Sequence, residues 1–98
     1  MKRIYEHTTE ALSTWRTGTL SCYLANMLAL RNLEGAEEQA RIAGEVLSQR
    51  KDHESVIAKK RFVHQLLRDV RGYCEKDEEQ GRARLEVNTD FTRYAFAA

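Results

Sequence analysis

The sequence predicts a mainly α-helical protein, in which two or three long antiparallel helices precede a short C-terminal β-hairpin. Three observations lead to this prediction. Proline is absent from the 98 residues, so nothing in the chain forces a helix to stop sharply. Large apolar residues recur at three-and-four spacing over most of the chain, which is the helical period. After Gly81 the spacing changes to alternation, which is typical of strands.

The first helix is expected over about residues 9–33. Thr8 or Thr9 can cap its start, because a hydroxyl there accepts a hydrogen bond from an otherwise unpaired backbone N–H. Helical spacing relates the apolar positions Leu12, Trp15, Leu20, Tyr23, Leu24, Met27 and Leu28. Gly18 lies inside this range and costs about 1 kcal/mol relative to alanine. It marks either a kink or a true break.

The second helix is expected over residues 36–51, after a break at Asn32, Glu34 and Gly35. Its apolar face is built largely from alanine, which would allow another helix to approach closely.

The third helix is expected over residues 53–78, with Asp52 as its cap. Neither glycine nor proline marks residues 50–55. This stretch is therefore either a turn, which gives a compact bundle, or part of one very long helix, which gives an extended hairpin that needs a partner.

The C-terminal segment is expected to form a hairpin over residues 82–96. Ala83, Leu85 and Val87 alternate with polar residues, and residues 88–90 have the composition of a turn. Residues 91–96, which are rich in aromatic side chains, would form the second strand. Because an isolated hairpin is marginal in water, it must pack on the helices, pair with the N-terminal segment or extend another chain's sheet.

Length and composition indicate one domain, residues 1–98, with a formal charge of +1. This balance gives no global attraction to nucleic acid or membranes. Cys22 and Cys74 are too few for a disulfide framework, so both are expected to be reduced and buried, which favours the cytoplasm. The most apolar run, residues 20–30, is too short to span a membrane.

No catalytic or cofactor motif is apparent. His7, His53 and His64 are scattered, and no pair of metal ligands has the spacing of a structural site, so neither a metal nor another cofactor is expected. Cys22 is expected on a buried face, where a thiol is normally inert. These observations favour a protein that is not an enzyme.

The residues most suited to binding form a basic stripe on the third helix. Between Arg50 and Arg71 there are seven positive residues and three negative ones. Helical spacing places four of them and a histidine on one face: Lys60, Arg61, His64, Arg68 and Arg71. Such a face is either a solvated surface balanced by acids on a neighbouring helix, a site for an acidic protein, or a site for phosphates.

Aromatic residues near the C-terminus offer a second candidate surface. Phe91, Tyr94 and Phe96 are either part of the core or, if the hairpin is exposed, anchors of a protein interface.

The chain also has a recognisable style. It lacks proline, opens with MKRIYEHTTEALSTW and is expected to be helical through AEEQARIAGEVLSQRKDHES. In this it resembles the small accessory proteins of temperate phages, among which are inhibitors or modulators of the host RecBCD recombination nuclease. The resemblance covers overall style and no motif, so it assigns no site residues. It implies a phage protein that works by docking on a large host machine.

Two functional hypotheses follow. The first is a non-enzymatic inhibitor or adaptor that binds a larger protein through the basic stripe and the aromatic tail. The second is a small nucleic-acid-binding protein that places Lys60, His64, Arg68 and Arg71 on phosphates, as a homodimer that doubles its modest charge.

Overall fold

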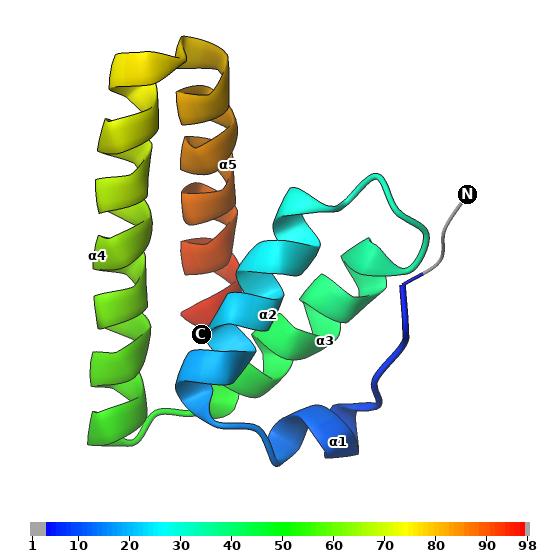
Figure 1. Ribbon diagram of the computed structural model, residues 1–98. Helices are drawn as coiled ribbons and strands as arrows, with labels where there is room; N and C mark the ends of the chain where they lie inside the picture. Colours follow the sequence, from blue (N-terminus) through cyan, green and yellow to red (C-terminus); the bar gives the residue numbers. More distant parts are fainter. Residues whose placement is uncertain (1–3, 98) are drawn as a thin grey trace.

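The computed structural model describes residues 4–97, and these residues form five helices. The helices are α1 (Thr9–Ser13), α2 (Thr17–Ala29), α3 (Ala36–Gln49), α4 (His53–Lys76) and α5 (Glu78–Ala95). Figure 1 shows two helical pairs, α2 with α3 and α4 with α5, with the short α1 below the first pair. The prediction of a mainly α-helical fold is confirmed, since 79% of the described residues are helical.

The predicted C-terminal hairpin is wrong, because residues 82–96 lie in α5 and its C-cap. The buried residues of this segment, Gly81, Asn88, Phe91 and Ala95, recur at helical spacing. The Asp77 carboxylate caps the start of α5 by accepting hydrogen bonds from the backbone N–H groups of Glu79 and Gln80. Asn88, which suggested a turn, instead lies inside the helix, where its side-chain amide donates to the carbonyl of Val63 at 3.2 Å.

The single helix expected over residues 9–33 is divided into α1 and α2. The break lies at residues 14–16 and not at Gly18, which is inside α2. The hydroxyls of Ser13 and Thr14 donate to backbone carbonyls of α1, and Arg16 has extended backbone angles. Hydroxyl groups of this kind compete with the helical hydrogen-bond ladder, which explains why the helix ends without glycine or proline.

The next two helices agree with the sequence pattern. Gly35 precedes α3 with a φ of 90°, a left-handed conformation that favours glycine. Residues 50–52 form a turn, so α3 and α4 are separate helices. Asp52 caps α4 as expected, by accepting a hydrogen bond from the backbone N–H of Ser55 at 3.0 Å. A further hydrogen bond joins α2 to α4, from the hydroxyl of Thr17 to that of Ser55.

The core lies where α2, α3 and α5 meet. Its buried residues include Leu20, Leu24 and Leu28 of α2, Ala36, Ala40, Ala43 and Leu47 of α3, and Phe91 and Ala95 of α5. The alanine-rich face of α3 does admit another helix closely, because a Cβ atom added to Gly44 would lie 2.7 Å from the Cβ of Tyr94. The prediction that both cysteines are buried is wrong, since Cys22 and Cys74 are exposed.

The α4–α5 pair is a tight antiparallel hairpin joined only through Asp77. Figure 1 shows that its turn extends away from α2 and α3, while the C-terminus returns to the body of the protein. The molecule is flat, with extents of 39 × 38 × 20 Å. Few residues near the turn are buried, so the hairpin exposes much of both helices.

Candidate protein-docking surface

The basic stripe predicted from the sequence forms an exposed surface on α4. Its five side chains, here called the basic face, are Lys60, Arg61, His64, Arg68 and Arg71, and all five are exposed. Asp52 caps the start of α4, and the apolar residues of this helix pack toward α5. The helical period that buries the apolar side of α4 therefore leaves the basic face exposed to solvent.

The cations of the basic face have no acidic partners within residues 4–97. Neither lysine nor arginine on this face forms an ion pair there, whereas Arg31, Arg41 and Arg93 do. The acids of α3 do not neutralise the basic face, because Glu38 and Glu45 pair with Arg41 of their own helix. The described residues therefore leave these cations free to pair with an external acidic group.

One edge of the basic face borders an open groove. Its lining residues are Lys60, Val63 and His64 of α4 with Thr92 and Phe96 at the end of α5, and its volume is about 270 Å³. Arg61, His64, Gln65 and Arg68 line a second depression on the other side. The structure thus brings Phe96 to the basic face, while Arg71 lies one turn beyond Arg68 on the same helix.

The other two predicted aromatic anchors do not belong to this surface. Phe91 is completely buried, and its ring lies 4.9 Å from that of Phe62. Tyr94 is half-buried and packs against Gly44 of α3. Both were expected to be exposed only if a hairpin formed, and the helix turns them inward instead. They are therefore removed from the set of docking residues.

Sequence reasoning missed Lys59, which is the most unusual residue near the groove. Its side chain is only 2% exposed, and its ammonium donates to the carbonyls of Leu47 at 2.8 Å and Ala95 at 2.9 Å. These carbonyls lie near the C-terminal ends of α3 and α5, where the helix dipole favours a cation. Burial lowers the pKa of Lys59. The sequence does contain a signal for this burial. Lys59 lies three residues after Val56 and four before Val63, which places it on the apolar side of α4.

Lys59 also holds the wall of the groove. Its Nζ atom lies 4.8 Å from the centre of the Phe96 ring, a cation–π contact. Because the same ammonium is tied to the carbonyl of the preceding residue, Ala95, the Phe96 ring is held against α4.

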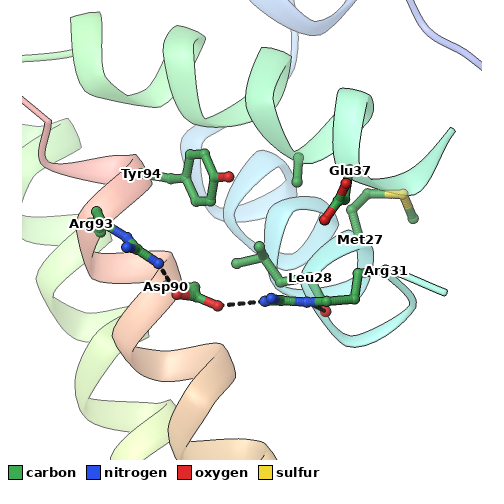
Figure 2. Close-up of a pocket in the computed structure, with 8 residues that line it drawn as sticks. Met27, Leu28, Arg31, Glu37, Asp90, Arg93 and Tyr94 are labelled. Atoms are coloured by element: carbon green, nitrogen blue, oxygen red, sulfur yellow. Dashed lines mark hydrogen bonds and ion pairs between the residues drawn. The ribbon is translucent and has the colours of Figure 1, made fainter.

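A separate ion-pair network joins the segment just after α2 to α5. Figure 2 shows Asp90 between Arg31 and Arg93, and Asp90 accepts hydrogen bonds from both guanidinium groups. The hydrogen bond from Arg31 is the main reason that the pKa of Asp90 is lowered, with a smaller effect from Arg93. The adjacent cavity, which Tyr94 also lines, has a volume of about 50 Å³. It has room for a few water molecules and is far smaller than a typical ligand pocket.

The described residues contain no cluster of three histidine, cysteine or acidic side chains suited to hold a metal ion. Cys22 lies on the exposed side of α2, outside the core cluster. None of the helices formed by residues 4–97 combines the length and hydropathy that crossing a bilayer requires.

Comparison of the chain with protein-family models, with curated proteins and with solved structures found no match.

Proposed function

We propose that this protein is a non-enzymatic accessory protein that binds a larger protein through the basic face of α4. The observation that carries the proposal is the absence of ion-pair partners for four exposed cations in the described chain. An acidic partner surface would supply those partners, and complementary charge of this kind gives specificity and speeds association. The groove at Phe96 adds apolar surface next to the charge.

The resemblance in style to temperate-phage accessory proteins suggests the first partner to test. A bacterial DNA-processing complex, with the RecBCD nuclease as the leading example, is the proposed target, and the protein would inhibit or modulate it in the host cytoplasm. The resemblance alone selects this target, whereas the basic face supports the mode of binding.

The test is affinity purification from a bacterial lysate with a tagged protein, followed by reconstitution with the purified partner. We expect Arg68→Glu/Arg71→Glu to lose the partner, because two attractive contacts become repulsive. The matched control is Arg16→Glu/Lys51→Glu, which makes the same charge change at two exposed cations outside α4, the N-cap of α2 and the residue before Asp52. Equal retention of the partner by both double variants would contradict the proposal.

Nucleic acid is the second candidate. It is favoured by the depression at Arg61, His64 and Arg68, whose lining contains no carboxylate. If phosphates occupy this site, affinity for duplex DNA falls as a steep power of salt concentration, and a homodimer would double the number of contacts. Unchanged retention of Arg68→Glu/Arg71→Glu on DNA would exclude this candidate.

A further inference from the structure

The groove at Phe96 continues along the junction between α4 and α5. Leu67 lies four residues after Val63 and is 38% exposed, so it extends the apolar surface by one turn of α4. Leu85 lies seven residues before Thr92 and is 46% exposed, which places it on the same side of α5 two turns earlier. Val63, Leu67, Leu85 and Phe96 together are called the α4–α5 seam.

Contacts between the two helices place these residues along one line. Phe62 packs on Phe91, and the amide of Asn88 donates to the carbonyl of Val63. Near the turn, Gly81 packs against Cys74. In this antiparallel register Leu67 and Leu85 lie at similar heights, between Phe96 at one end and the turn at the other. Leu85 and Phe96 are eleven positions apart, which corresponds to about 16 Å of helix, or three turns.

Charge on the seam is one-sided. Lys60 and His64 line the groove itself, and Arg71 lies four residues after Leu67 on the same side of α4. The groove lining contains no carboxylate. A straight apolar strip of three turns with cations along one border is complementary to a helix that carries apolar anchors on one side and acids beside them.

We infer that the α4–α5 seam binds an acidic amphipathic helix of the partner protein, with two or three apolar anchors spaced over about three turns. This inference rests on the proposed function and specifies the segment of the partner that is recognised. The phosphates of a nucleic acid would pair with the cations, but a nucleic acid has no aliphatic anchors that would pack on Leu67 and Leu85. A second copy of this chain offers the acids of α3, but the apolar residues of that helix, such as Ala40 and Leu47, are buried.

The experiment uses a synthetic helical peptide of glutamate, alanine and leucine, with three leucines at positions i, i+4 and i+11. Titration is followed by the amide resonances of the whole protein. We expect saturable binding with shifts concentrated on α4 and on α5 from Leu85 to its C-terminal end. Leu67→Ala/Leu85→Ala should weaken binding about tenfold, because two leucines lose the surface they would bury. Leu30→Ala is the matched control, since this leucine of the α2 C-cap is 44% exposed and lies away from the seam.

A control peptide whose leucines are replaced by alanine distinguishes recognition of charge from recognition of apolar anchors. If this peptide binds as tightly as the leucine peptide, charge alone is recognised and the inference is overturned, although the basic face would still bind acidic proteins. If neither peptide binds while the purified partner still depends on Arg68 and Arg71, the inference again fails and the proposed function stands. If sedimentation shows a dimer that Leu67→Ala/Leu85→Ala dissociates, the seam is occupied by a second copy, which also overturns it.

Discussion

Replacement of Gly44 by alanine tests the position of α5 directly. The added Cβ atom would lie 2.7 Å from the Cβ of Tyr94 and 3.0 Å from its Cδ1, both closer than normal contacts. The nearest atom is attached to the backbone, so a change of side-chain rotamer does not relieve the overlap. The helices α3 and α5 must therefore separate by several tenths of an ångström, which loosens the core packing of Leu47 and Phe91.

The expected magnitude is a balance of two effects. Alanine in place of glycine inside a helix stabilises by about 1 kcal/mol. Overpacking of a close helix contact costs about 1–3 kcal/mol and more when the obstructing atom is fixed. We therefore expect a net loss of about 1–2 kcal/mol in the free energy of unfolding. For a domain of this size that is a decrease of about 5–15 °C in Tm.

Gly72 provides the matched control. It lies in α4, is exposed, and has no atom within 4 Å of an added Cβ atom. Gly72→Ala should therefore raise stability by about 0.5–1 kcal/mol, because only the helix propensity changes. Urea denaturation followed by circular dichroism and by the fluorescence of Trp15 measures both variants. A Gly44→Ala protein as stable as the Gly72→Ala protein would refute the contact between α3 and α5.

Three further outcomes are expected. Lys59→Met should lower the free energy of unfolding by about 2–4 kcal/mol in urea denaturation, because the carbonyls at the ends of two helices lose a buried hydrogen-bond donor. A change below about 0.5 kcal/mol would contradict this role of Lys59. Asp90→Asn should cost about 1 kcal/mol at neutral pH, since its arginine partners are largely exposed. Because the folded-state pKa of Asp90 lies below the ordinary 3.8, this difference should be complete above pH 3.8 and disappear as the pH falls through the lowered value; a difference that persists in acid would point to another cause. Gly81→Ala, whose Cβ atom would lie 3.0 Å from the backbone N and Cα of Cys74, should speed amide hydrogen exchange near the α4–α5 turn, and unchanged exchange would show that the turn is looser.

The C-terminal segment shows how short patterns mislead. Alternation at Ala83, Leu85 and Val87 fits a strand, but it covers only a few residues and is compatible with a helix whose buried face lies elsewhere. Over a longer window the spacing of Asn88, Phe91 and Ala95 is helical, and the acids after Asp77 suit the first turn of a helix. These helical signals are present in the sequence, but the turn composition of residues 88–90 points the other way.

Burial could not be predicted with the same success. Lys59 belongs chemically with the exposed cations of α4, yet the ends of two other helices surround it. Phe91 and Phe96 are similar residues five positions apart, but one is in the core and the other borders the groove. Such differences depend on neighbours that are distant in sequence, and a helical period cannot supply those neighbours.

By itself, the sequence determined the helical character of most of the chain, the cap at Asp52 and the basic face of α4. These properties depend on residues within a few positions of one another, so periodicity, capping and charge reveal them. Only the tertiary structure decided that Phe91 is buried and that Phe96 joins Lys60 and His64 at one groove. The physical reason is that burial and charge pairing are set by contacts between distant segments, and these form only when the helices pack.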